Sequence, residues 1–120
     1  MGFFAEFNKN RAIKSYILKL PNLLIRTHGK SQKYTPVQII AVAENYKLNL
    51  KQIGFAMAMF STKHNFDSYV HKAGLKWKYK VMRREVADKY FGGQVGFEII
   101  HTKPSLYKGK ADGDLWRSDL

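Results

Sequence analysis

The 120-residue sequence contains no cysteine, and this absence excludes several classes of protein. Without thiols the chain has no disulfide scaffold, no thiol nucleophile and no zinc or iron–sulfur centre with cysteine ligands. Its longest apolar runs, residues 39–43 and 55–60, are far shorter than the roughly 20 residues of a membrane-spanning helix. The first residues lack the basic and then apolar stretches of a secretory signal. We therefore expect a cytoplasmic protein with no membrane partner.

Acidic residues are scarce, because nine Asp and Glu stand against 21 Lys and Arg and give a formal net charge of +12. The excess lies in residues 1–91, which hold 17 basic and five acidic residues, whereas residues 92–120 hold four of each. Such a charge attracts polyanions, including nucleic acids and acidic proteins. The length favours a single domain over residues 1–120, with a basic helical core over 1–91 and a charge-neutral strand and tail over 92–120.

Apolar residues nevertheless make up 45% of the chain, and aromatic residues 14%, which is enough to bury one core. Residues 3–20 carry apolar side chains at helical spacing, with most of their lysines and arginines outside that stripe. We predict an amphipathic helix there. Pro21 ends or kinks this helix, or it occupies the first turn of a short second helix over residues 22–26.

A capping-box pattern marks the clearest helix start in the sequence. Residues 35–38 read Thr-Pro-Val-Gln, the arrangement found where side chains cap the first N–H groups of a helix. We predict a helix over residues 36–46. A similar pattern recurs from Asn49 and predicts another helix over residues 50–61.

The remaining segments complete the predicted fold. A helix that begins near Asn65 ends at Gly74, which suits a left-handed cap, and the longest clear helix follows over residues 75–91. Residues 95–101 are rich in β-formers and predict a strand, and the apolar residues within 105–120 predict a tail that packs back onto the helices. We therefore expect a mostly α single domain of five or six short helices, with a short C-terminal β element and a packed tail.

The helices predicted over residues 36–46 and 50–61 have helix-turn-helix spacing, which raises the hypothesis of DNA recognition. A recognition helix needs a polar face to reach base edges and phosphates. The second helix has no polar side chain from residue 53 to residue 60. We interpret it as a buried helix at the centre of the fold.

The helix predicted over residues 75–91 has a basic face. A turn of about 100° per residue gathers four basic side chains in one arc without an acid among them, and it puts a tryptophan at the border. These residues are Lys76, Lys80, Arg83, Arg84 and Trp77. Unpaired cations beside an exposed or half-exposed aromatic ring are typical of surfaces that contact phosphates and stack bases, so we predict an anion-binding or nucleic-acid-binding site here. The alternative is a solvated face with Trp77 turned into the core.

Patterns for catalysis or metal binding are weak. His101 ends the predicted strand and is a candidate general base for the hydrolysis of nucleic acid beside the basic helix. His64, Asp67 and His71 share one helical face, but His64 precedes the predicted helix and no further metal ligand is indicated. A solvated face is the simpler interpretation of this trio. We predict no metal and no cofactor.

Three functions stay open at this point. The first is a non-catalytic binding module whose basic surface meets RNA or DNA. The second is a protein-interaction or regulatory module that uses the strand over residues 95–101 to augment a partner's sheet or to pair in a homodimer, or that binds an acidic protein. The third is a small nucleic-acid hydrolase. The sequence leaves the oligomeric state open.

Overall fold

A computed structural model describes residues 2–99, and side chains from residue 5 onward. It is mostly helical, and no strand forms within the described residues. The helices are α1 (Gly2–His28), α2 (Pro36–Asn45), α3 (Ile53–Phe60), α4 (Lys63–Ala73) and α5 (Tyr79–Tyr90). No helix among these residues combines the length and the hydropathy needed to cross a bilayer.

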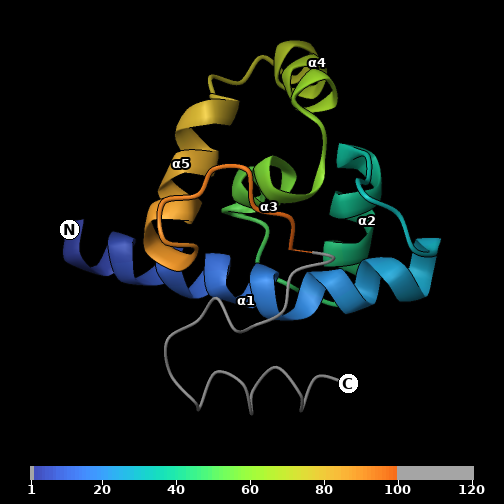
Figure 1. Cartoon of the computed structure of the whole chain (residues 1–120), viewed down its shortest axis with the longest axis horizontal. Coiled ribbons are helices and arrows are strands. Elements are labelled where there is room, and N and C mark those ends of the chain that lie inside the picture. The colour runs from blue at the N-terminus through green and yellow to red at the C-terminus, as the bar shows by residue number, and fades with distance from the viewer. Residues whose placement is uncertain (1, 100–120) are drawn as a thin grey trace.

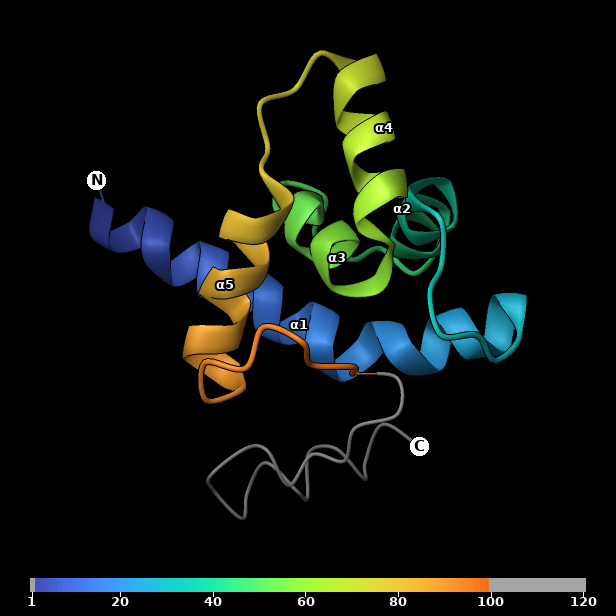
Figure 2. The same cartoon turned by 45° about the horizontal axis from the view of Figure 1, so that its top comes forward.

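Helix α3 forms the centre of the molecule, as its apolar sequence predicts. All eight of its residues are buried, and it contacts each of the other four helices. Figures 1 and 2 show α1 along one side of α3 and α4 on the opposite side, with α2 and α5 flanking α3. Gly54 permits a close approach, because a Cβ atom there would lie 2.9 Å from the Trp77 ring. Burial without a polar face confirms that α3 is a core helix.

Helix α1 is longer than expected, because it continues through Pro21 to His28. The prediction that Pro21 ends the first helix or starts another is wrong. A proline in a helix interior removes one backbone hydrogen bond and costs roughly 3 kcal/mol. Ile17, Leu20 and Leu24 are buried on both sides of the proline, so their packing holds the helix across it.

Side-chain caps begin two of the helices. The capping box of α2 is confirmed: Gln38 N donates to Thr35 Oγ1 at 3.1 Å, and Thr35 N donates to Gln38 Oε1 at 3.0 Å. Helix α4 starts slightly before Asn65, because Thr62 Oγ1 accepts from Asn65 N at 3.1 Å. Gly74 ends α4 with a φ of 69°, the left-handed cap that the sequence predicts.

The second predicted capping box does not form. Asn49 Oδ1 accepts from Lys51 N at 2.7 Å, which closes a turn ahead of the helix, and α3 begins at Ile53 instead of residue 50. Asparagine side chains bond readily to the backbone two residues on, and this local turn competes with the cap.

The helix predicted over residues 75–91 begins only at Tyr79, and residues 75–78 are extended. The Trp77 ring explains this late start. It stacks on Tyr69 with 6.5 Å between ring centroids, and it lies against Phe66 at 6.4 Å. Because these contacts draw the tryptophan back over α4 and α3, the chain resumes a helix only beyond it.

The prediction of a strand over residues 95–101 is wrong for the part that the structure describes, since residues 95–99 form turns and coil. The backbone carbonyls of Val95 and Phe97 accept hydrogen bonds from Arg83, and the Phe97 ring stacks on Phe91 at 4.5 Å. Carbonyls held in this way cannot pair with a second strand. Residues 100–101 and the predicted tail over 105–120 lie outside the described residues.

Candidate functional site

A pocket of about 680 Å³ lies where the start of α4, the start of α5 and residues 95–98 meet. Five cations and one carboxylate line it, so we call it the basic pocket. Its lining residues are Lys33, Thr62, Lys63, Tyr79, Lys80, Arg83, Arg84, Val95, Gly96 and Glu98. Its volume falls within the range of about 300–1,000 Å³ usual for ligand sites.

Three segments position the basic side chains of the pocket. Lys33 comes from the link between α1 and α2, and Lys63 is the first residue of α4. Lys80 and Arg84 lie on α5 four residues apart, so they share one helical face. Residues far apart in the sequence therefore direct like charges at one hollow, which raises its positive potential.

Carboxylates neutralise only part of this charge. Lys33 Nζ lies 3.4 Å from Glu98 Oε1, and Lys63 Nζ lies 2.5 Å from an oxygen of Asp67, one turn further along α4. Lys80 and Arg84 are exposed, and no carboxylate within residues 5–99 forms an ion pair with either. These two side chains are therefore available to an anion from solution.

Lys33 is the most enclosed of the lysines in the pocket. Its side chain is 24% exposed. Burial lowers the pKa of Lys33, and the nearby charge of Arg83 lowers it further, although Glu98 acts in the opposite direction. An anion placed in the pocket would favour the charged form of this lysine.

Arg83 is buried, which corrects the expectation that it lies on an exposed face with Lys80 and Arg84. Its Nη1 donates to the Ala58 carbonyl at 2.9 Å, and its Nε donates to the Val95 carbonyl at 2.8 Å. The guanidinium carbon lies 4.0 Å from the centre of the Phe97 ring. Ala58 is in the last turn of α3, where carbonyls lack intrahelical partners, so Arg83 caps that helix and fastens the segment after α5.

Trp77 and Lys76 also differ from the prediction. Neither is on α5, because the helix starts after them. Trp77 is half-buried, and its ring packs against Phe66 and Tyr69 of α4. Its ring lines a smaller hollow of about 330 Å³ beside the basic pocket. The structure thus brings Lys80, Arg83 and Arg84 together in the pocket and leaves Trp77 and Lys76 outside it.

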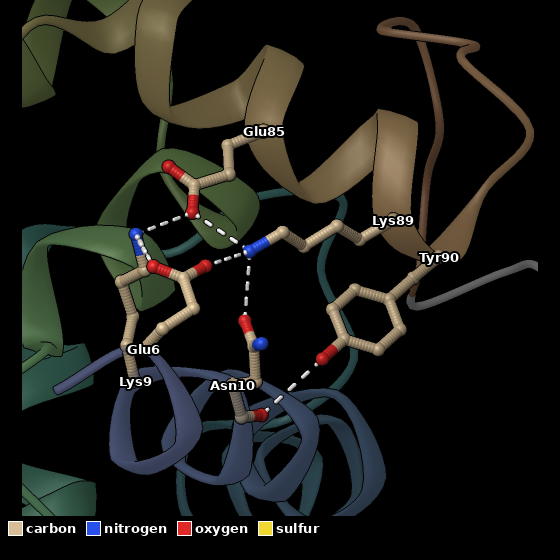
Figure 3. A network of polar contacts seen from close by, with 6 residues as sticks. All are labelled: Glu6, Lys9, Asn10, Glu85, Lys89 and Tyr90. Atoms are coloured by element: carbon tan, nitrogen blue, oxygen red, sulfur yellow. Dashed lines mark hydrogen bonds and ion pairs between the residues drawn. The ribbon is translucent and has the colours of Figure 1, made fainter. Parts of the chain in front are cut away.

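Of the acidic residues near α5, Glu85 and Asp88 line a neighbouring hollow together with Lys80 and Arg84. Glu85 and Glu6 also contact two lysines away from the basic pocket. Figure 3 shows them in a polar network between α5 and α1. Lys89 Nζ lies 2.5 Å from Glu6 and 3.1 Å from Glu85, and it donates to Asn10 at 2.9 Å. Lys9 Nζ lies 2.6 Å from Glu85. Hydrogen bonds from the two lysines lower the pKa of Glu6, and in Glu85 they outweigh the opposing effect of burial. This network holds α5 on α1 and leaves the basic pocket with little acid.

The histidines add no metal site. Within residues 5–99, no group of three or more His, Asp or Glu side chains is arranged to hold a metal ion, and this includes the trio at residues 64, 67 and 71. His101, the candidate general base, lies outside the described residues.

Sequence reasoning missed six side chains of the pocket: Lys33, Thr62, Lys63, Tyr79, Val95 and Glu98. Lys33 is in a polar link without periodicity, and nothing local distinguishes it from other surface lysines. Among these residues, only Lys63 stands next to a local pattern that marks it, because it is the first residue of a helix.

The fold and the pocket define a small, mostly helical, basic protein with a cationic hollow between its helices. The family of unknown function DUF6559 matches residues 4–118, and the chain belongs to this family. No curated protein and no solved structure is similar enough to the chain to match it.

Proposed function

We propose that the protein is a cytoplasmic, non-catalytic module that binds RNA or DNA through the basic pocket and its rim. The observation that carries this proposal is the convergence of Lys33, Lys63, Lys80 and Arg84 on one hollow, with Arg84 and Lys80 unpaired within the described residues. Unpaired cations in a concave surface attract phosphates and release counterions when these bind.

The contacts are to backbone phosphates and not to bases. Trp77 is half-buried and packs against Tyr69, so less of its ring is open to a base. Lys80 borders the basic pocket and two neighbouring hollows, which places one cation where three concave surfaces meet. Binding of this kind is largely independent of nucleic-acid sequence.

The two other functions have less support. A module that augments a partner's sheet needs a free strand edge, but residues 95–99 form turns whose carbonyls bond to Arg83. A hydrolase needs a general base, and the candidate His101 lies outside the described residues, so the structure adds no support for this function. Binding to an acidic protein uses the same cations and is an alternative result of the experiment below.

Fluorescence-anisotropy titrations with short single-stranded RNA and duplex DNA, at low salt and at about 0.15 M salt, test the proposal. The double variant K80Q/R84Q removes the two unpaired cations. The matched control, K14Q/K19Q, removes the same charge from exposed positions on α1. We expect the pocket variant to weaken binding and to reduce the slope of log K against log salt by about 1.4 on single strands, and the control to change both much less.

Equal losses in the two double variants would contradict the proposal, because net charge alone would then explain the binding. So would the loss of all binding at about 0.15 M salt. Retention of an acidic peptide but not of nucleic acid at that salt would assign the pocket to an acidic protein instead.

A further inference from the structure

We propose that the basic pocket takes the terminal phosphate of a nucleic-acid strand, a phosphomonoester, in preference to an internal phosphodiester. This inference rests on the proposed function and specifies which group of the nucleic acid enters the site. It follows from the shape of the pocket, from its uncompensated charge and from the burial of Lys33.

The shape of the pocket suits the end of a strand. The start of α4, the first turns of α5, residues 95–98 and Lys33 line it, and Arg83 lies among its lining residues with its guanidinium bound inward. An internal phosphate carries a sugar on each side and has to continue out of such a hollow in two directions. A terminal phosphate enters it from one direction only.

The charge of the pocket suits a dianion. Five cations and one carboxylate line it, and Asp67 offsets Lys63 from just outside, so three positive charges stay uncompensated. A phosphomonoester carries about −1.5 to −2 charges near neutral pH, compared with about −1 for each backbone phosphate. The excess therefore stabilises a terminal phosphate more strongly.

The two helices that begin at the pocket increase this preference. Neither α4 nor α5 has an acidic residue in its first turn, and α5 has no side-chain cap. Both place a lysine there, Lys63 and Lys80, where the positive end of the helix dipole disfavours a cation. A bound dianion offsets this repulsion at both helix ends at once, in addition to pairing with the lysines.

Lys33 is more enclosed than Lys80 and Arg84, the exposed cations at the rim of the pocket. The side chain of Lys33 is 24% exposed, compared with 54% for Lys63, so Lys33 is the more enclosed of these two cations. Burial lowers the pKa of this lysine, so its charged form gains from an anion bound in the pocket. Lys80 and Arg84, which are exposed, contact a strand in either arrangement.

Anisotropy titrations with one single-stranded RNA sequence in three forms test the inference: with hydroxyls at both ends, with a 5′-phosphate, and with a 3′-phosphate. Each phosphorylated RNA carries its label at the end opposite the phosphate, and it is compared with the hydroxyl form labelled at that same end. The salt is about 0.15 M. We expect one phosphorylated form to bind about tenfold more tightly than the hydroxyl form, as charge-assisted hydrogen bonds to a dianion would give.

Variants locate the preference. Lys33→Gln should abolish the preference, lowering the affinity for the phosphorylated form more than the affinity for the hydroxyl form, because a dianionic terminal phosphate gains more from this lysine than a backbone phosphate does. Glu98→Gln should increase the preference, since it removes the carboxylate of the pocket. Lys14→Gln, the matched change on α1, should leave it intact. Urea unfolding of each variant checks that it folds.

Equal affinity for all three RNA forms, with binding retained, would overturn this inference and leave the proposed function standing. No binding by any form at this salt would remove the proposed function as well. Adenosine monophosphate that competes as well as the phosphorylated RNA would also overturn the inference, because the ligand would then be a free nucleotide.

Discussion

Arg83 and Arg84 are neighbours in the sequence with opposite roles, and exchanging each for methionine separates those roles. Arg83 is 6% exposed and donates to carbonyls on α3 and on the segment after α5. Arg84 is exposed at the rim of the basic pocket. Methionine keeps most of the apolar stem of arginine, so Arg83→Met removes the donors without leaving a large cavity.

The cost of Arg83→Met follows from the carbonyls that it leaves behind. Ala58 and Phe97 are 0% and 5% exposed, so their carbonyls cannot turn to bulk water. Each buried acceptor without a partner costs about 1–3 kcal/mol. Relief of the desolvation of the guanidinium offsets part of this sum. We therefore expect Arg83→Met to lower the free energy of unfolding by about 2–4 kcal/mol, and Arg84→Met to change it by less than about 0.5 kcal/mol.

Urea denaturation followed by circular dichroism measures both free energies, and anisotropy titration measures nucleic-acid binding. For an m-value of about 2 kcal/mol per molar urea, the midpoint of Arg83→Met should fall by about 1–2 M. Arg84→Met should instead weaken nucleic-acid binding and keep the wild-type midpoint. Similar midpoints for the two variants would refute the argument that Arg83 is a structural cap.

Three further predictions concern the scaffold, each checked by urea denaturation. Gly54→Ala places a Cβ atom 2.9 Å from the Trp77 ring and should destabilise the fold by about 1–3 kcal/mol, so a neutral effect would contradict the close packing. Thr35→Ala removes the cap of α2 and should cost about 1 kcal/mol, with Thr35→Ser as a control that keeps it. In Glu85→Gln the network between α5 and α1 is weakened. Because its lysine partners hold the pKa of Glu85 below the ordinary 4.5, the stability advantage of the wild type should be full above that pH and disappear as the pH falls through the lowered pKa. If the wild type kept the same stability advantage over Glu85→Gln in acid, this pH dependence would be contradicted.

Features that depend on neighbours in the sequence could be predicted from it. The capping box at residues 35–38 and the left-handed cap at Gly74 need only side chains and backbone within a few residues of each other. The burial of α3 follows from eight consecutive residues without a polar side chain. The excess of positive charge is likewise a property of composition.

Features that depend on contacts distant in the sequence could not be predicted. Packing on both sides of Pro21 carries α1 past a residue that usually ends a helix, and the Trp77 ring delays the start of α5. In both places the structure departs from the local preference of the chain. At Pro21, burial against other helices outweighs the roughly 3 kcal/mol that a proline costs in a helix interior.

The basic pocket shows the same division. The sequence predicts that Lys76, Lys80, Arg83 and Arg84 share one helical face. In the structure Lys80, Arg83 and Arg84 line the pocket, whereas Arg83 is buried and Lys76 precedes the helix. Only the tertiary structure decides that the end of α3 presents carbonyls to Arg83, and that Lys33 and Lys63 complete the hollow from other segments. Helical periodicity fixes the direction of a side chain relative to its own axis, whereas its partners are set by how the helices pack.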